Sequence, residues 1–226
     1  MLTVSPRGLA LCAAAVFVLS SCHAQDGGLD TGRDYNVCLF KGFKTGAGGM
    51  RLPVWRPYVL LKDGSAYENP NSPPELLDAS SSRQSEPARW GSWTRQGNEV
   101  TLNIASHQPM STTHCISPAP AGTTLDGSYK HVGGGGTLAA GGHASFMRSD
   151  RYRFNADGSF DSGRSSGLIS PGASSVSESA RSGHYQIHDY SIELRYDDGS
   201  QATLFFYSDG RQLLHLGEDD YVPATD

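Results

Sequence analysis

Near the C-terminus of this 226-residue chain, short segments of alternating apolar and polar residues follow one another, separated by two-residue turns. The segments cover 185–187, 190–196, 202–207 and 213–216, and the turns are His188-Asp189, Asp198-Gly199 and Asp209-Gly210. Asp-Gly pairs favour type I′ turns, which connect neighbouring antiparallel strands. Alternation over 190–196 places apolar side chains on one face and polar side chains on the other. The pattern therefore predicts an up-and-down antiparallel meander.

The composition extends this prediction to the rest of the chain. It contains 27 Gly and 12 Pro, which break helices, and Ser is abundant and competes for backbone hydrogen bonds. We therefore expect an all-β protein with very little helix, and an all-α architecture is excluded. The one good helix start is Ser72-Pro73-Pro74-Glu75, in which Ser72 is the expected N-cap of a short turn through Leu77.

Two parts of the chain carry a similar pattern, which suggests a duplicated β-unit. Asp63-Gly64-Ser65 is followed by Gly91-Ser92-Trp93, and Asp157-Gly158-Ser159 is followed by Gly183-His184-Tyr185. Asp-Gly turns between apolar strands are common, so chance similarity is the alternative. We divide this region into an N-terminal β half (35–116), a Pro-rich connector (117–122) and a C-terminal β-meander half (123–226). The sequence leaves open whether the halves form one barrel-like or sandwich body or two sheets.

The first 22 residues have the features of an export signal. Arg7 precedes an apolar run over 8–19, and small residues lead to Cys22. The run is shorter than the ~20 residues that cross a bilayer core, so residues 1–21 are interpreted as a signal peptide rather than a permanent span. Residues 22–34 are polar and Gly-rich, and we expect them to form a flexible tether.

The sequence Leu19-Ser20-Ser21-Cys22 resembles the lipobox of bacterial lipoproteins. The resemblance implies that Cys22 is acylated and becomes the new N-terminus. Because His23 rather than Asp follows Cys22, it also implies delivery to the outer membrane, with the body facing the periplasm. An ordinary secretory cleavage after Ala24, with loss of Cys22, is the alternative.

Two cysteines then remain in the exported chain. Cys12 leaves with the signal peptide and Cys22 carries lipid, which leaves Cys38 and Cys115. In an oxidising compartment two thiols favour one disulfide, and a pair of buried free thiols is the alternative.

The C-terminal half resembles lipocalin-like β-meander modules of bacterial envelope proteins. The matching residues are Gly127-Ser128-Tyr129, Asp157-Gly158 and Gly183-His184-Tyr185, with Tyr129 in place of the lipocalin Trp. The resemblance implies a barrel that carries a small apolar ligand. Inward-facing residues would line its cavity, and the candidates are Phe154, Tyr185, Leu194 and Phe206.

A second candidate surface lies in the N-terminal half. Trp90 and Trp93 are three residues apart, so a regular strand turns them to opposite faces, and Arg89 and Arg95 flank them. An exposed Trp beside arginines suits a protein partner. The net charge of −5 disfavours nucleic acid as a partner.

Catalytic and metal motifs are weak. Gly163-Arg164-Ser165-Ser166-Gly167 fits the nucleophile elbow of serine hydrolases, but the residues after it cannot start a helix, so a flexible Ser/Gly loop is predicted instead. His107, Met110, His114 and Cys115 could hold a soft metal, but Cys115 is assigned to the disulfide. We expect no cofactor, no metal and no enzyme activity. The sequence favours a membrane-anchored binding or interaction module, with a small-ligand carrier as the alternative and a hydrolase as a third class.

Overall fold

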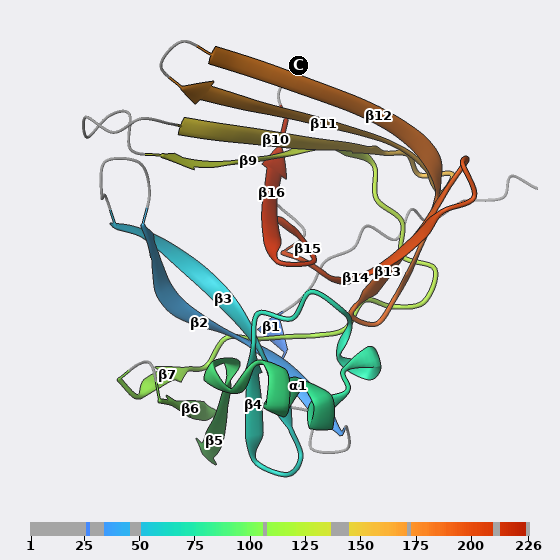
Figure 1. The fold of residues 1–226 in the computed structure, drawn as a ribbon. Helices are drawn as coiled ribbons and strands as arrows, with labels where there is room; N and C mark the ends of the chain where they lie inside the picture. The colour runs from blue at the N-terminus through green and yellow to red at the C-terminus, as the bar shows by residue number, and fades with distance from the viewer. Residues whose placement is uncertain are drawn as a thin grey trace, which may run out of the picture.

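The chain folds into two antiparallel β bodies (Figure 1), which confirms the all-β prediction. The computed structural model describes residues 26–27, 34–45, 51–105, 108–136, 145–170, 173–209 and 213–224. Helix within these ranges is confined to the segment between β4 and β5, as α1 (Ala79–Ser85) and the 3-10 turns η2 (Pro74–Leu76) and η3 (Pro87–Arg89). In the described part of the chain, no helix is both long and apolar enough to span a membrane.

The N-terminal half is an eight-stranded sheet with the order β1-β8-β2-β3-β4-β5-β6-β7, and it is nearly closed. β2 and β7 approach each other without forming a ladder: Thr112 Oγ1 donates to the carbonyl of Leu39 over 2.8 Å. β1 falls within the predicted tether, and its pairing with β8 holds this part of the tether to the sheet. The strands are β1 (Asp26–Gly27), β2 (Tyr35–Thr45), β3 (Arg51–Leu61), β4 (Ser65–Glu68), β5 (Trp90–Gln96), β6 (Glu99–Ile104), β7 (Met110–Thr112) and β8 (Cys115–Ile116).

The C-terminal half is a closed eight-stranded barrel with the order β10-β11-β12-β13-β14-β15-β16-β9. A short ladder between β16 and β9 closes it, with Val222 opposite Lys130 and Pro223 opposite Tyr129. The strands are β9 (Gly127–Gly136), β10 (Ser145–Phe154), β11 (Ser159–Ser170), β12 (Ala173–His188), β13 (Ser191–Tyr196), β14 (Gln201–Ser208), β15 (Leu214–Leu216) and β16 (Asp219–Pro223).

An apolar layer joins the two halves. Alternate residues of β2 turn away from their own sheet and pack against residues of the barrel wall. Tyr190 Oη donates to the carbonyl of Ile116 over 2.6 Å, which fixes the end of β8 against the barrel. The halves are therefore two sheets packed together rather than one barrel. The buried members of the layer are Val37, Leu39, Ile116, Tyr190, Phe205 and Tyr207.

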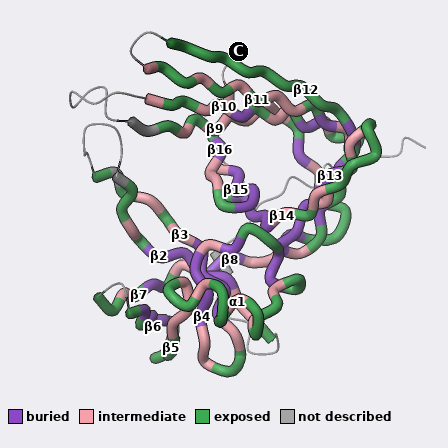
Figure 2. Tube along the Cα trace, in the orientation of Figure 1, coloured by how far each residue is buried: buried purple, intermediate pink, exposed green. Residues whose placement is uncertain are grey.

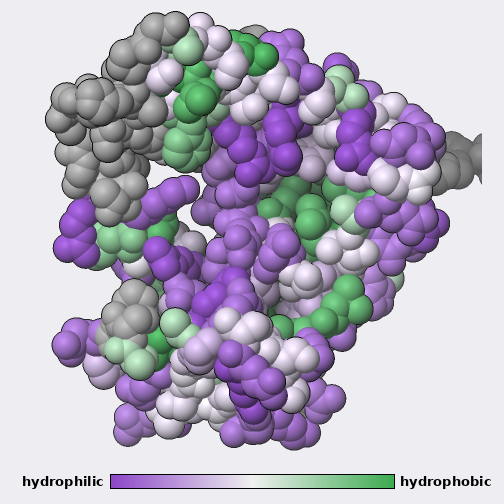
Figure 3. Space-filling view, in the orientation of Figure 1, coloured by the Kyte–Doolittle hydropathy of each residue, from purple (hydrophilic) through white to green (hydrophobic). Residues whose placement is uncertain are grey.

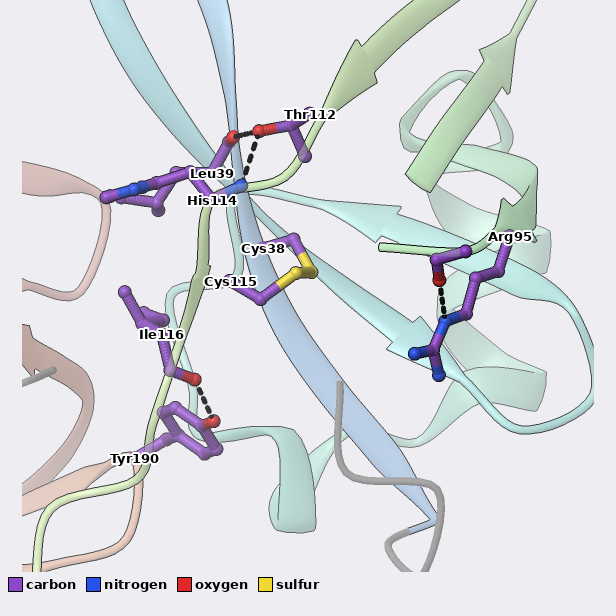
Figure 4. Close-up of a disulfide and its surroundings, with 9 residues drawn as sticks. Cys38, Leu39, Arg95, Thr112, His114, Cys115, Ile116 and Tyr190 are labelled. Carbon is purple, nitrogen blue, oxygen red and sulfur yellow. Dashed lines mark hydrogen bonds between the residues drawn. A yellow bond between two sulfur atoms is a disulfide. The ribbon is translucent and has the colours of Figure 1, made fainter. Parts of the chain in front are cut away.

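The predicted disulfide between Cys38 and Cys115 is confirmed (Figure 4). The two cysteines are direct partners on β2 and β8, and both side chains are buried. The bond closes a loop with a sequence separation of 77 residues. In the chain-entropy model, such a loop stabilises the fold by roughly 4–5 kcal/mol.

The Asp-Gly turns differ from the predicted type I′ geometry. Gly199 donates to the carbonyl of Tyr196 (2.9 Å), and the amide of Tyr196 donates to the carbonyl of Ser200 (2.9 Å). Gly199 has a φ of 83°, whereas Asp198 has no positive φ, although type I′ requires one at both central positions. This is a three-residue loop, in which Asp198 Oδ1 accepts from the amide and the hydroxyl of Ser200. The turn predicted at Asp209-Gly210 lies partly outside the described residues.

The two halves of the chain share one local arrangement, at the positions where their sequence patterns match. The carbonyl of Gly64 accepts from the amide of Trp93 (2.9 Å), and the carbonyl of Gly158 accepts from the amide of Tyr185 (2.8 Å). The side chains of the same two aromatic residues also donate to the carbonyl of the residue that opens each turn. Trp93 Nε1 donates to the carbonyl of Leu61 (2.8 Å), and Tyr185 Oη donates to the carbonyl of Asn155 (3.0 Å). These matched contacts favour duplication over chance similarity.

The Ser/Gly segment around Ser165 is not the predicted loop. β11 and β12 are 12 and 16 residues long, and with β9 and β10 they continue beyond the barrel as a four-stranded sheet. We call this part the extension. On β12 every extension residue is exposed (Figure 2). By register, the extension comprises 131–136, 145–150, 164–170 and 173–179.

Candidate functional site

A pocket of about 360 Å³ opens at one end of the N-terminal sheet. Its walls come from β2, β3 and the start of β7, which are the strands that approach each other where the sheet fails to close. Phe40, Tyr58 and Met110 lie on the sheet face that carries the disulfide, so the pocket is continuous with the core of this half. The remaining lining residues are Lys41, Gly42, Phe43, Arg51, Arg56, Gln108 and Pro109.

The floor of the pocket is aromatic. Phe40 and Tyr58 are fully buried, with ring centroids 5.2 Å apart and ring planes at 80°. Burial, and then the neighbouring Glu68 carboxylate, raises the pKa of the Tyr58 hydroxyl well above its ordinary value. The hydroxyl therefore stays neutral at physiological pH and acts as a hydrogen-bonding group beside an apolar surface.

The rim of the pocket is cationic. Arg56 Nη1 contacts Glu68 Oε1 at 2.6 Å, and its Nη2 donates to the carbonyl of Phe43, so a buried carboxylate balances its charge. Arg51 lies over the Phe43 ring, with its guanidinium carbon 4.4 Å from the ring centroid. Within the described residues no carboxylate pairs with Arg51 or with Lys41. Lys41 Nζ lies 5.2 Å from the centroid of the Trp55 ring, on the opposite face of the sheet from Phe40. An apolar floor with Arg51 at its rim suits a small molecule with an apolar part and an anionic group.

Gly42 keeps the pocket wall open beside Arg56. A Cβ at this position would lie 3.3 Å from Arg56 Nε and 3.4 Å from its Cδ. The Arg56 side chain crosses the space that a larger residue at position 42 would fill. A branched or long side chain there would displace Arg56 and reduce the volume of the pocket.

The four candidate cavity residues of the barrel are brought together, but they pack against one another. Phe154, Tyr185, Leu194 and Phe206 belong to one buried cluster, and each is at most 8% exposed. The Phe154 and Tyr185 rings meet edge to face at 5.0 Å. Tyr185 Oη also accepts from the amide of Leu125 over 2.7 Å. These four side chains therefore form part of a packed core inside the barrel.

Beside this core, the base of the extension is polar. Asp150 is buried and contacts two arginines, Arg148 at 2.5 Å and Arg164 at 2.6 Å. A pocket of about 100 Å³ lies here, and its lining includes Asp150, Arg164, Tyr152 and Arg181. It is small and largely occupied by ion pairs, which makes it a weaker candidate than the pocket of the N-terminal sheet.

The tryptophan and arginine candidates do not form one surface. Trp93 packs against the inner core, whereas Trp90 lies under α1, where its Nε1 donates to Ser82 Oγ (3.1 Å) and Arg83 covers its ring. The two residues thus face opposite ways, as predicted from their spacing. Arg89 makes internal contacts with Glu86 and Glu218, and Arg95 donates to the carbonyl of Gly97 in its own hairpin.

The weaker motifs are also located. Ser165 lies within β11, opposite Ser149 and Glu178, rather than on the strand-to-helix turn that a nucleophile elbow requires. Among the described residues no group of three or more His, Cys, Asp or Glu side chains could hold a metal ion. Cys22 and His107 lie outside the described residues.

Sequence reasoning missed the pocket of the N-terminal sheet. Two signals were available in the sequence. Cys38, Phe40 and Gly42 alternate along β2 and share one face, and Arg56 lies opposite Phe40 on β3. That alternation identifies a core face, but it does not show that the sheet stays open at this end.

Comparison of the chain with protein-family models, with curated proteins and with solved structures finds no match.

Proposed function

We propose that this protein is a non-catalytic binding module of the bacterial envelope that holds a small, partly apolar anion in the pocket of its N-terminal sheet. The observation that carries the proposal is the combination of a fully buried aromatic floor with Arg51 at the rim. The lipocalin-like alternative places the ligand in the barrel. The packed contacts among Phe154, Tyr185, Leu194 and Phe206 favour the N-terminal pocket instead.

A pair of fluorescent probes tests this assignment. Anilinonaphthalenesulfonate carries an aromatic body and a sulfonate, whereas N-phenylnaphthylamine has the same kind of body without charge. We expect one site for each probe. Arg51→Gln should weaken sulfonate binding about threefold to tenfold by removal of a partly exposed charge, with little effect on the neutral probe.

Two further variants complete the test. Gly42→Leu should displace both probes because it fills the pocket beside Arg56. Arg95→Gln is the matched control, since Arg95 is an exposed arginine of the same sheet that does not line the pocket. Unchanged binding in both Arg51→Gln and Gly42→Leu would refute the assignment.

The second part of the proposal is attachment to the outer membrane, facing the periplasm, through an acylated Cys22. Its support is the resemblance of Leu19-Ser20-Ser21-Cys22 to a lipobox. Expressed in a Gram-negative host with radiolabelled palmitate, the chain should become labelled, and Cys22→Ser should abolish the label. Labelling that survives this substitution would contradict the acylation site.

A further inference from the structure

One acidic side chain lies behind the wall of the pocket in the N-terminal sheet. Glu68, the last residue of β4, is the direct partner of Tyr58 on β3, and it is buried. Glu68 does not itself line the pocket, but two residues that do are its neighbours. Arg56 Nη1 contacts Glu68 Oε1 at 2.6 Å, and the same carboxylate neighbours the Tyr58 hydroxyl. Any effect of Glu68 on a ligand therefore passes through these two side chains.

The guanidinium of Arg56 is already occupied by the protein. Its Nη1 contacts Glu68, and its Nη2 donates to the carbonyl of Phe43 over 3.3 Å. The Arg56 side chain is 37% exposed and reaches the pocket, whereas the Glu68 side chain is 11% exposed. The pair carries no net charge. A ligand that reaches Arg56 therefore meets a fixed, neutral ion pair rather than a cation.

Arg51 has a different environment. Its guanidinium lies over the ring of Phe43, and no carboxylate pairs with it in the described part of the chain. Figure 3 shows hydrophobic and strongly hydrophilic surface side by side near the outer end of β2 and β3. Both arginines of the pocket thus contact Phe43, but only Arg51 is without a carboxylate partner.

This arrangement limits the charge that a ligand can carry. Removing an ionised group from water is costly unless a counter-charge meets it. A ligand with one negative charge can pair with Arg51 while its apolar part covers Phe40 and Tyr58. A second negative charge would meet the neutral pair of Arg56 and Glu68, which does not compensate for its lost hydration.

We propose that Glu68 sets the charge selectivity of the pocket. By holding Arg56 in a neutral pair, it restricts the ligand to amphiphiles with a single negative charge, such as carboxylates and sulfate esters, and disfavours phosphate monoesters. The inference rests on the proposed function, because it concerns the ligand of the same pocket. Glu68 is a positioning residue, since it acts through Arg56.

Two ligands with the same apolar chain test the proposal. Octyl sulfate carries one negative charge, whereas octyl phosphate carries nearly two at pH 8, because the second pKa of a phosphate monoester is about 6. Their displacement of N-phenylnaphthylamine from the unacylated Cys22→Ser chain measures both affinities. We expect a preference for octyl sulfate. Glu68→Gln frees the charge of Arg56 and should strengthen octyl phosphate binding about threefold to tenfold, octyl sulfate binding less, and N-phenylnaphthylamine binding not at all.

A charge cycle separates electrostatics from packing. Arg56→Gln leaves the Glu68 carboxylate unpaired and should weaken the binding of both anions. Arg56→Gln/Glu68→Gln removes both charges of the pair, so the ratio of the two affinities should return close to the wild-type ratio. Glu99→Gln is the matched control, since Glu99 is an exposed carboxylate of the same sheet that does not line the pocket. Unchanged affinity for the neutral probe and coincident urea unfolding curves would show that each variant keeps its fold.

The results distinguish this inference from the proposed function. The proposed function fails if N-phenylnaphthylamine does not bind, or if Gly42→Leu leaves its binding unchanged. The role of Glu68 alone is overturned if the probe binds and Gly42→Leu displaces it, but Glu68→Gln leaves the ratio of the two anion affinities as it was. An equal change of that ratio in Glu99→Gln would also overturn it. Arg56→Gln and the double variant give the same decision if Glu68→Gln does not fold.

Discussion

At the scale of single residues, Arg89 shows how a side chain that looks suited to a partner can serve the fold instead. Its Nε donates to the carbonyl of Glu68 (3.0 Å), another of its nitrogens donates to the carbonyl of Asn69, and its Nη1 contacts Glu86 (3.2 Å). The same Nη1 contacts Glu218 at 3.1 Å, in the turn between β15 and β16. Arg89 therefore connects the N-terminal sheet to the barrel.

Replacing Arg89 by alanine should lower the free energy of unfolding by about 2 kcal/mol, because two half-buried carbonyls and two carboxylates lose a shared donor. The side chain is 25% exposed, so solvent screens part of the effect. Urea denaturation measures the change. Arg95→Ala should stay within about 0.5 kcal/mol of the wild type. An equal loss of unfolding free energy in the two variants would show that the contacts of Arg89 add no stability beyond that of an exposed arginine.

Residue-level prediction succeeded where chemistry alone constrains the outcome. Cys38 and Cys115 were predicted to be the two thiols that remain after export to an oxidising compartment, and they are bonded. It missed Phe40, Tyr58 and Arg51, because a pocket depends on where a sheet fails to close. That failure is a property of the whole sheet, and no single side chain encodes it.

At the scale of elements, three Asp-Gly-Ser turns use the same carboxylate geometry. Asp63, Asp157 and Asp198 each accept hydrogen bonds from the amide and the hydroxyl of the serine two residues later. These hydrogen bonds from serine lower the pKa of each carboxyl below its ordinary value. The charged form of each aspartate is therefore favoured in the folded state.

Because the folded-state pKa lies below the unfolded value of about 3.9, this contribution to stability is fully present above about pH 4. It is lost as the pH falls through the folded-state pKa. We expect the urea midpoint to fall between about pH 4 and pH 2, and Asp157→Asn should make this acid dependence shallower. Asp161→Asn, outside these turns, is the control. An unchanged slope in Asp157→Asn would contradict the assignment.

Strands were predicted correctly where apolar and polar residues alternate between turn residues. They were missed where the residues have a weak strand propensity. The strands over 185–216 were found because apolar residues alternate between turns. The Ser/Gly stretches of β11 and β12 have neither feature, and their strand structure comes from ladders with neighbouring strands. Ser72 was expected to cap a helix, but the N-cap residue of η2 is Pro73. The helix α1 begins later, at Ala79, and the side chain of its N-cap Asp78 accepts from the amide of Ser81.

At the scale of the whole molecule, the apolar layer between the halves makes their stabilities interdependent. Phe205 is fully buried there, whereas the adjacent Phe206 is fully buried inside the barrel. Neighbouring residues of one strand thus serve two different cores.

Phe205→Ala should cost about 3–5 kcal/mol and uncouple the halves, because it leaves a cavity in the layer that joins them. All three tryptophans, Trp55, Trp90 and Trp93, lie in the N-terminal half, so their fluorescence reports that half alone. Wild-type unfolding curves from fluorescence and far-UV circular dichroism should coincide, and those of Phe205→Ala should separate. Phe206→Ala should lower both midpoints together. Coincident curves in Phe205→Ala would argue against coupling through this layer.

The bond between Cys38 and Cys115 also determines how mechanical force travels through the protein. Ile116 follows Cys115 and leads to the barrel, so tension between the N-terminal segment and the barrel passes from β2 to β8 across the two sulfur atoms. The backbone between the two cysteines, which includes Phe40, Arg51 and Met110, lies outside that covalent path. Tension along the chain would therefore bypass the backbone of the residues that line the pocket. The molecule would release the length of that loop only after the sulfur bridge is reduced.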